Sequence, residues 1–208
     1  MTMKLHCFGE SGNAYKAALT LTLAGCDWTP EFVDFFKGAT RSQEFRALNV
    51  MGEVPVLQDG EIVLTQSAVI QDYVSSKTGK LGGQSAVERR EVLRWMFFDN
   101  HKVSGVAGTL RFNMNFLPAE KRNEAVNSFL AMRLASALKV METHLEGRDW
   151  LATGQITIAD LACCGYLFYP EPFTFIRADY PNIDRWLDRI ASQHGWKHPY
   201  DLMQRAFV

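Results

Sequence analysis

The residues best suited to chemistry stand at 49–67, where a predicted hairpin leads into a predicted helix. Apolar runs at 54–57 and 62–64 flank Asp59-Gly60, which predicts a β-hairpin closed by a type I′ turn. An extended backbone edge and a helix N-terminus would then lie side by side. The first can pair with a peptide backbone and the second with a carboxylate, so we expect this segment to bind a small peptide with a free amino-acid end.

Four residues of this segment carry that expectation. Pro55 opens the first strand and has no N–H for a sheet ladder, so it must lie at an edge or a strand entrance. Its bond to Val54 could be cis, which would turn the N–H and C=O of Val54 outward. Gln66 and Ser67 follow the hairpin, and Ser67 is predicted to begin the next helix.

The elements that must position these residues follow the order β-α-β-α-β-β-α. Apolar residues at helical or strand spacing predict each element, and Gly25 can close the first helix. The predicted elements are a strand at 4–8, a helix at 14–24, a strand at 31–35, a short helix at 44–48, the hairpin, and a helix at 67–77. We assign residues 1–77 to one α/β domain.

The remainder of the chain has the period of helices. Residues 78–85 are rich in Gly, Ser and Lys and are predicted to be a linker, so residues 86–208 form a predicted all-α domain. A capping box at 85–88 opens one long helix, and a second long helix is predicted at 118–145. A further capping box at 157–160 opens a buried helix whose role we expect to be structural.

Composition narrows the function classes. The 208 residues are 47% hydrophobic and 22% charged, and the net charge of -1 gives no electrostatic case for binding nucleic acid. No apolar run reaches the ~18 residues of a membrane span. The four cysteines show neither disulfide nor metal-ligand spacing. We expect a cytoplasmic protein with no metal and with no nucleic-acid or membrane partner.

Five motifs in order resemble those of the glutathione S-transferase family, and the likeness covers nearly the whole chain. They are Ser11-Gly12-Asn13, the run at 49–57, Gln66-Ser67, the Gly154-x-x-Thr157-Ile158-Ala159-Asp160 cap, and Tyr180-Pro181-x-Ile183-x-x-Trp186. The resemblance implies a thioredoxin-like domain followed by an all-α domain, with glutathione as co-substrate.

The chain also departs from the family pattern. Val50 stands where a Pro usually follows the Asn, and the first turn holds neither Tyr nor Cys. Cys7 falls inside the first strand rather than at the catalytic position. The turn lacks the Ser-Ser-Cys-Ser-like run of the maleylacetoacetate isomerase branch, so the sequence favours a serine-type, bacterial-like member and leaves the class open.

The resemblance assigns the catalytic role to the first turn. The reaction needs a thiolate near neutral pH, and a hydroxyl donor together with a helix N-terminus can lower a thiol pKa. With the resemblance, Ser11 is the leading candidate to hold the sulfur, although in isolation a simple N-cap would be the favoured interpretation. Asn13 is the competing candidate, because its amide N–H could reach the same sulfur.

The remaining glutathione contacts follow the segment described first. Val54, preceding Pro55, would pair with the cysteinyl unit, and Gln66 and Ser67 would hold the γ-glutamyl end. Lys37 could reach the glycyl carboxylate, or be an ordinary solvated loop lysine.

An apolar pocket between the domains should receive the electrophile. The aromatic and sulfur-containing side chains alternate in RFNMNF, which makes Phe112, Met114 and Phe116 weak candidates for its lining. These residues are expected just after the first long helix.

The leading function is glutathione transfer to an electrophilic substrate, as in detoxification, with glutathione-dependent peroxidase activity as a possible addition. A glutathione-dependent disulfide reductase and a non-catalytic binding module on the same fold are the alternatives. The resemblance also implies a homodimer built on the two long helices, in which Asp99 could reach the partner's glutathione. The electrophile itself stays open.

Overall fold

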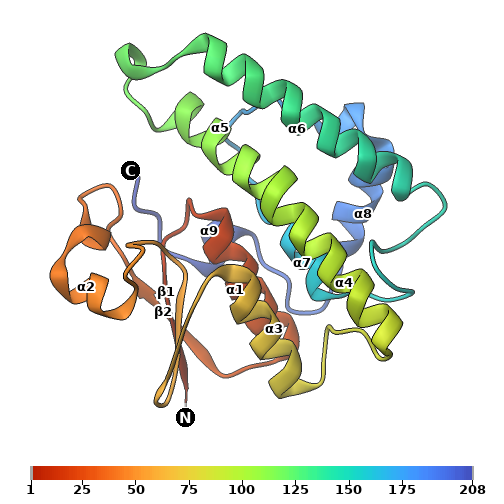
Figure 1. Ribbon diagram of the computed structural model, residues 1–208, viewed down its shortest axis with the longest axis horizontal. Helices are drawn as coiled ribbons and strands as arrows, with labels where there is room; N and C mark the ends of the chain where they lie inside the picture. Colours follow the sequence, from red (N-terminus) through yellow and green to blue (C-terminus); the bar gives the residue numbers. More distant parts are fainter. Residues whose placement is uncertain (1, 208) are drawn as a thin grey trace. The chain divides into compact units, whose positions relative to one another are not determined.

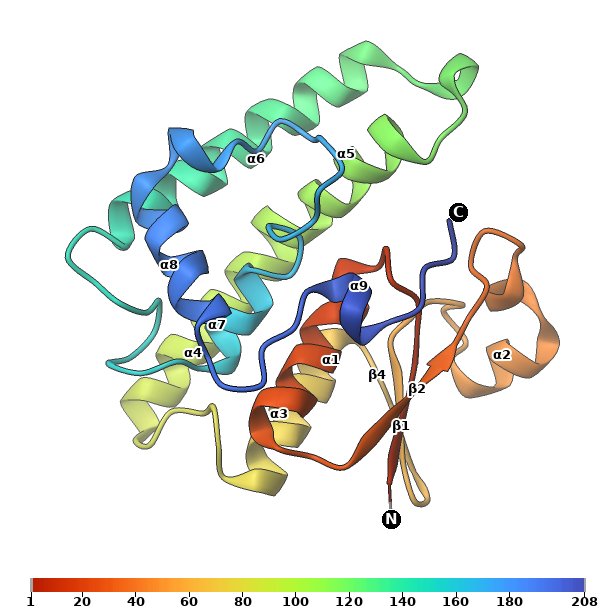
Figure 2. The same ribbon diagram turned by 180° about the vertical axis from the view of Figure 1, so that it is seen from behind.

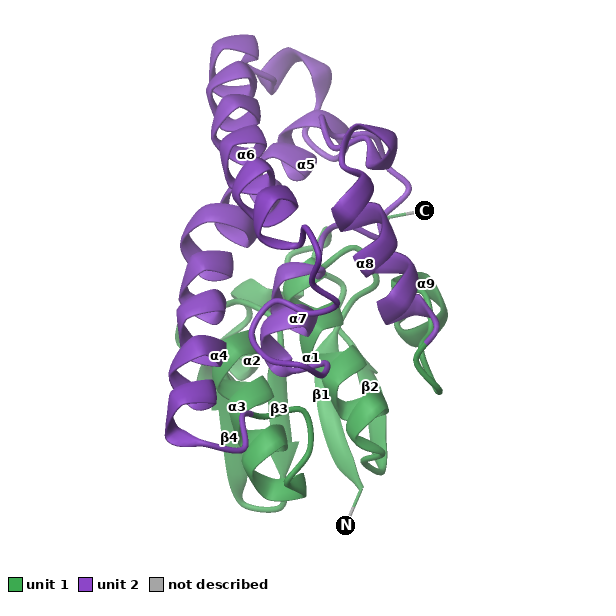
Figure 3. Cartoon of the chain, turned by 90° about the vertical axis from the view of Figure 1, so that its right-hand side faces the viewer, with its two compact units in different colours: residues 1–82, 193–208 green, residues 83–192 purple. Residues whose placement is uncertain are grey.

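A computed structural model describes residues 2–207, which form two compact units (Figure 3). The first unit holds the described residues up to 82 together with those from 193 onward, and the second holds residues 83–192. The C-terminal stretch thus packs with the N-terminal part of the chain. The predicted division into domains at 1–77 and 86–208 with a linker at 78–85 remains a prediction.

A four-stranded mixed sheet forms the base of the first unit (Figure 1). The strand order is β2-β1-β3-β4, and β1 pairs parallel to β2 and antiparallel to β3. The strands are β1 (Met3–Cys7), β2 (Trp28–Phe32), β3 (Val56–Asp59) and β4 (Ile62–Thr65). Leu5 and Leu57 face each other in the β1–β3 register and are fully buried, so the sheet centre is apolar.

The second strand lies three residues earlier than the sequence predicted. Pro30 lies inside β2, which is an edge strand of the sheet, and an edge is where a residue without an N–H is tolerated. The predicted bounds of 31–35 were wrong, because several strand boundaries fit the same apolar pattern.

The hairpin is confirmed, but its turn is not the predicted one. Asp59 pairs with Ile62, so the two turn residues are Gly60 and Glu61. Of these only Gly60 has a positive φ, of 60°, which excludes the type I′ turn. The glycine supplies the single left-handed position, and Asp59 belongs to the strand.

Helices complete the first unit. They are α1 (Gly12–Ala24), α2 (Gln43–Leu48), α3 (Ser67–Thr78) and α9 (Pro199–Leu202). The α1 and α3 helices pack against each other beside the sheet (Figure 2), and Leu19 and Ile70 are fully buried there. The predicted order β-α-β-α-β-β-α is therefore confirmed, as is the Gly25 cap, which has a φ of 76°.

The second unit is helical. Its principal elements are α4 (Ala86–Phe98), a π-helical turn (Asp99–Ser104), α5 (Gly105–Asn115), α6 (Glu124–His144), α7 (Ile158–Cys163) and α8 (Pro181–Ala191). The predicted capping box of Ser85 and Glu88 is present. The α6 helix begins six residues later than predicted, because the Asn123 side chain caps it by accepting from Ala125 and Val126 N–H groups.

The capping box of α7 is also present and is fully buried. Asp160 accepts hydrogen bonds from the backbone N–H of Leu151 and Thr157, at 2.9 Å each, and from the indole Nε1 of Trp186 at 3.0 Å. Burial raises the pKa of the Asp160 carboxyl, while these donors oppose that rise. One side chain therefore joins three segments of the second unit.

These two architectures confirm the predicted fold class. The first unit is a mixed sheet with helices in a thioredoxin-like order, and the second is all-helical. Within the described chain, no helix combines the length and the apolar character that crossing a bilayer requires.

Candidate functional site

Ser11 is the N-cap of α1. Its backbone is extended, and its Oγ accepts a hydrogen bond from the N–H of Ala14 at 3.1 Å. A hydroxyl has one donor besides its acceptor lone pairs, so the capping bond leaves the O–H available to an anion. The cap fixes Oγ at the half-buried helix N-terminus, where the dipole favours negative charge.

Asn13 lies in the same first turn, one residue into the helix after Gly12. Its side chain is half-buried, so the structure brings the two predicted catalytic candidates to one helix N-terminus. Which of them would hold a sulfur stays a prediction.

Among the described residues, no side chain caps the N-terminus of α3. Gln66 occupies the cap position with a φ of 68°, and in the described chain its side chain makes no capping hydrogen bond. It instead donates to the sulfur of Met51 at 3.0 Å. A non-glycine residue in the left-handed region is strained, and such strain concentrates at ligand sites. Ser67 begins the helix as predicted and is half-buried.

Val54 lies two residues before the start of β3, outside the strand ladder, and its bond to Pro55 is cis. The loop before it is organised by Asn49, whose side-chain amide donates to the carbonyl of Glu53 at 2.8 Å and accepts from the N–H of Met51 at 3.1 Å. Local hydrogen bonds therefore hold the segment that ends at Val54.

Gly52 occupies a position in that loop where a side chain would not fit. Its φ is 65°, and a Cβ there would lie 2.9 Å from the carbonyl oxygen of Thr40. Val50, which replaces the usual Pro, is 78% exposed, so the departure from the pattern leaves the loop's hydrogen bonds untouched.

Lys37 is not an unpaired cation. Its Nζ lies 2.9 Å from the Asp34 carboxylate, and this contact together with the backbone N–H of Lys37 lowers the pKa of Asp34. The lysine side chain is 86% exposed, so the pair is a weak surface one. Lys37 would have to leave Asp34 to meet a ligand carboxylate.

The three predicted pocket residues lie on helix α5 or at its C-terminal end, and α5 follows α4 and the π-helical turn. Residues four apart share a helix face, and the rings of Phe112 and Phe116 have centroids 6.3 Å apart. Met114 lies on a different side, because a step of two residues turns a helix by about 200°. The three side chains therefore do not share one face of α5, and their assignment to a pocket stays a prediction.

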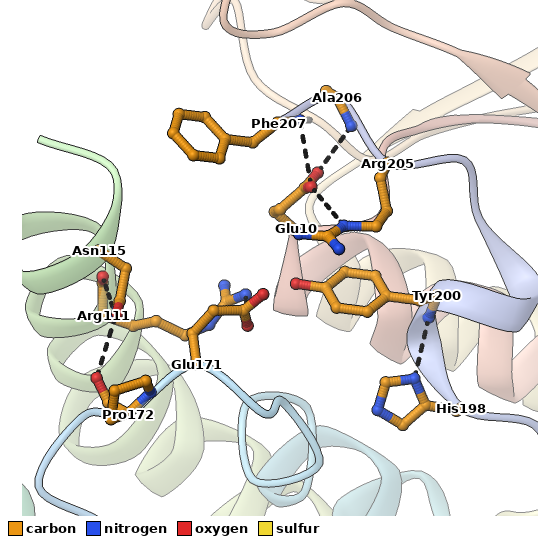
Figure 4. Close-up of polar contacts among 10 residues, drawn as sticks. All are labelled: Glu10, Arg111, Asn115, Glu171, Pro172, His198, Tyr200, Arg205, Ala206 and Phe207. Atoms are coloured by element: carbon orange, nitrogen blue, oxygen red, sulfur yellow. Dashed lines mark hydrogen bonds and ion pairs between the residues drawn. The ribbon is translucent and has the colours of Figure 1, made fainter.

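A buried arginine fixes the end of α5. Arg111 is 2% exposed and pairs with Glu171 at 2.6 Å (Figure 4). Its guanidinium also stacks over the rings of Tyr169 and Phe116. It joins the helix to the loop at 169–172 within the second unit.

Glu10 is a residue that the sequence analysis missed. Its carboxylate accepts from the N–H groups of Ala206 and Phe207, at 2.9 and 3.1 Å, and pairs with Arg205 at 3.3 Å (Figure 4). It directly precedes Ser11. No sequence signal could reveal it, since its partners stand 195 to 197 positions away.

Three of the four cysteines, Cys7, Cys163 and Cys164, are buried. Burial, and then the charge of Glu31, raise the pKa of the Cys7 thiol to about 12. Cys163 and Cys164 are fully buried on or next to α7. Residues 2–207 hold no group of His, Cys, Asp and Glu side chains able to bind a metal ion.

Comparison with known families agrees with this geometry. The model of the glutathione S-transferase N-terminal domain matches residues 1–76, and that of the C-terminal domain matches residues 111–194. The chain belongs to the glutathione S-transferase family. The expected enzyme class is thereby confirmed at the level of the family.

Individual glutathione S-transferases and related proteins are similar over almost the full chain. Glutathione S-transferase 3 of Zea mays is 32% identical, over 94% of this chain and 91% of its own length. Elongation factor 1-gamma 3 of rice (Oryza sativa subsp. japonica) is 24% identical over 95% of this chain but only 48% of its own.

Solved structures of the family superpose closely. A possible glutathione S-transferase from Rhodopseudomonas palustris has a TM-score of 0.89 at 31% identity, covering 96% of this chain and 90% of its own. A glutathione transferase from Burkholderia graminis, with two glutathione molecules bound per subunit, has a TM-score of 0.84 at 25% identity, covering 93% and 85%.

Proposed function

We propose that this glutathione S-transferase conjugates the thiolate of glutathione to an electrophilic carbon. The observation that carries the proposal is that one unit contains two suitable features. Among the described residues, no side chain caps the N-terminus of α3, and the Ser11 hydroxyl in the first turn can still donate a hydrogen bond. One offers an anion site for an amino-acid end, and the other offers a donor to a sulfur anion.

Binding would follow the peptide character of glutathione. The backbone of Val54, before cis-Pro55, pairs with the cysteinyl unit, while Gln66 and Ser67 hold the γ-glutamyl carboxylate. Lys37 reaches the glycyl carboxylate once it leaves Asp34.

The chemical step needs the thiolate rather than the thiol. A donor at Ser11, assisted by Asn13 and the α1 dipole, stabilises the charged sulfur and lowers its pKa. The sulfur then forms a bond to the electrophilic carbon, and the leaving group departs with its electron pair. The thiol proton passes to solvent before attack.

Peroxide reduction would use the same thiolate. The sulfur attacks one peroxide oxygen and displaces an alcohol, giving a sulfenic acid of glutathione. A second glutathione then displaces water and forms glutathione disulfide, so both electrons come from two thiols.

A disulfide reductase is the second candidate. It would need two glutathione molecules, and the Burkholderia graminis relative is described with two bound per subunit. The absence of a cysteine from the first turn is compatible with it only on that route. A non-catalytic role is the third, since an elongation-factor subunit shares the sequence pattern.

A kinetic panel distinguishes these functions. The purified chain is assayed with glutathione against 1-chloro-2,4-dinitrobenzene, cumene hydroperoxide and a glutathione mixed disulfide. Transferase function requires saturable turnover of the halonitroarene above the uncatalysed rate. Turnover of the mixed disulfide alone would instead establish the reductase, and inactivity on all three would favour the binding module.

The second unit carries a surface suited to the homodimer. Large apolar side chains are exposed along its two long helices: Leu93 and Phe97 on α4, and Phe129, Met132 and Val140 on α6. A groove of about 310 Å³ lies among Phe98, Lys102, Arg133, Ser136, Ala137 and Val140.

Asp99 does not belong to that surface. It is 2% exposed and accepts from the Ser104 hydroxyl at 2.7 Å, so the expectation that it reaches a partner was wrong. Sedimentation at micromolar concentration should give twice the 23.6 kDa chain mass, and a stable monomer would contradict the dimer.

A further inference from the structure

A buried polar contact joins helices α1 and α3. The side-chain amide of Gln71 on α3 donates to the hydroxyl of Thr20 on α1 at 3.1 Å, and both residues are fully buried. The Thr20 hydroxyl in turn donates to the carbonyl of Lys16 at 2.7 Å. This chain of hydrogen bonds therefore crosses from α3 to α1 and ends on the backbone of α1.

The two helices begin at the same edge of the sheet. Strand β1 pairs antiparallel to β3, and β3 pairs antiparallel to β4, so β1 and β4 run in the same direction. Helix α1 follows β1, helix α3 follows β4, and the two helices pack side by side (Figure 2). The turn that bears Ser11 and the helix start at Ser67 therefore lie at one edge of the first unit.

Gln71 and Lys16 lie equally far from the starts of their helices. Gln71 is four residues into α3 from Ser67, and Lys16 is four residues into α1 from Gly12. Four residues of an α-helix rise about 6 Å. The chain of hydrogen bonds thus leaves α3 and ends on α1 about one turn below the two N-termini that the proposed function uses.

A directional contact of this kind fixes the register of two helices. A hydrogen bond weakens steeply once its angle falls below about 120°, so it opposes the sliding or rotation of one helix against the other. Burial of apolar side chains is non-directional and opposes such movement less. In the dry interior the bond is also electrostatically stronger than in water. The contact between Gln71 and Thr20 therefore restrains α3 on α1.

The same side chain carries an oxygen that has no donor. Among the described residues, nothing donates to the Oε1 of Gln71, although the atom is buried. The single proton of the Thr20 hydroxyl goes to Lys16, so it cannot also go to this oxygen. An unpaired buried acceptor destabilises a fold, and an apolar side chain of similar shape would avoid that loss. Stability alone therefore does not explain Gln71, whereas a role in register does.

We infer that Gln71 is a positioning residue for the glutathione thiolate: its hydrogen bond to Thr20 holds the N-terminus of α3 in register with that of α1. Glutathione bound at Ser67 then presents its sulfur to the Ser11 hydroxyl. The inference rests on the proposed function. Replacing Gln71 removes no proposed ligand contact, so its loss should weaken thiolate stabilisation and spare glutathione affinity.

The thiol pKa of bound glutathione tests this, measured from the ultraviolet absorbance of the thiolate against pH. Gln71→Met keeps an unbranched side chain and removes the amide. It should raise that pKa by about half a unit, which means about threefold less thiolate at a pH below it, with glutathione affinity within about twofold. The melting temperature should stay the same or rise, because the unpaired oxygen is gone. Gln71→Leu is the second variant, and the same results are expected of it.

Three further variants separate register from stability. Val74→Ala shortens a fully buried side chain of the same helix, so it should lower the melting temperature and leave the thiol pKa unchanged. Thr20→Ser keeps the hydroxyl to which Gln71 donates, so it should also leave the pKa unchanged. Ser11→Ala combined with Gln71→Met should shift the pKa no further than Ser11→Ala alone, since the hydroxyl to be positioned is gone.

The outcomes distinguish this role from the proposed function. An unchanged thiol pKa in Gln71→Met and Gln71→Leu would overturn the positioning role and leave glutathione binding intact. Equal pKa shifts in Gln71→Met and Val74→Ala, or additive shifts in the double variant, would overturn it as well. Failure of the unmodified protein to bind glutathione, or an ordinary thiol pKa in the bound peptide, would overturn the proposed function and this role together.

Discussion

Two helices in this protein, α7 and α3, differ in how their N-termini are capped. At α7, Asp160 completes a capping box and also accepts hydrogen bonds from the indole N–H of Trp186 and the backbone N–H of Leu151. At α3, the cap residue Gln66 has a strained φ of 68° and, among the described residues, gives the helix no side-chain bond. The N-terminus of α7 is therefore capped by side chains, whereas in the described chain that of α3 is not.

The difference separates stability from binding. The N–H groups of a buried helix N-terminus must bond to acceptors within the protein, because each one left unpaired lowers the stability of the fold. A terminus at the surface can leave them to water and hence to a ligand. The motif at 157–160 is therefore structural, and the motif at 66–67 is where we expect glutathione.

The largest effect on stability should come from the N-terminus of α7, which Asp160 caps. Asp160→Ala leaves buried N–H donors of Leu151, Thr157 and Trp186 without their acceptor. We expect a loss of about 3–5 kcal/mol in the free energy of unfolding, measured by urea denaturation. A loss below about 1 kcal/mol would mean that water replaces the carboxylate, and the contrast with α3 would fail.

The first turn should show a large effect on rate with little effect on binding. Ser11→Ala should lower turnover about tenfold and move the pH–rate profile alkaline by about one unit, since one pKa unit is about 1.4 kcal/mol. Glutathione affinity should stay within a few-fold, because the peptide ends supply it.

Asn13→Ala is the control for Ser11, since it lies in the same turn. It should change the profile less. The reverse ranking would transfer the thiolate-holding role to Asn13, and two unchanged profiles would leave it to backbone N–H groups and the helix dipole.

Substitutions at the N-terminus of α3 should lower glutathione affinity and leave stability unchanged, the reverse of the effect at α7. Ser67→Ala and Gln66→Ala should each weaken glutathione about fivefold, which corresponds to one net hydrogen bond. The melting temperature should hardly change, because neither side chain caps α3 in the described structure. A large thermal shift with unchanged affinity would make this terminus structural as well.

The smallest effect concerns the hairpin that supports α3. Hydrogen bonds from Lys77 and then from Tyr73 lower the pKa of Asp59. A lowered folded-state pKa gives stability that is present above the unfolded pKa and is lost as pH falls through the folded one. Asp59→Asn should cost less than about 1 kcal/mol at pH 7, and its difference from the unmodified protein should vanish in acid.

Local patterns made much of the fold predictable. The capping boxes at 85–88 and 157–160, the hairpin, and the start of α3 at Ser67 depend on residues a few positions apart, and each was confirmed. The edge position of Pro30 and the cap of α6 by Asn123 were missed, because several boundaries fit the same apolar pattern.

Contacts between distant segments were beyond prediction. In the sequence Glu10 looks like an ordinary turn residue. Only the structure shows that its carboxylate accepts a hydrogen bond from the backbone N–H of Ala206. The Lys37–Asp34 pair is local but equally hidden, since charge spacing alone does not tell a surface pair from a free ligand-binding cation.

One titration tests the central claim, that the open α3 terminus holds the γ-glutamyl end. Calorimetry with cysteinylglycine, which lacks that residue, is compared with glutathione under the same conditions. The account predicts that cysteinylglycine binds at least about tenfold more weakly, since it gives up charge-assisted bonds to the helix terminus. Equal affinities, or no glutathione binding at millimolar concentration, would contradict it.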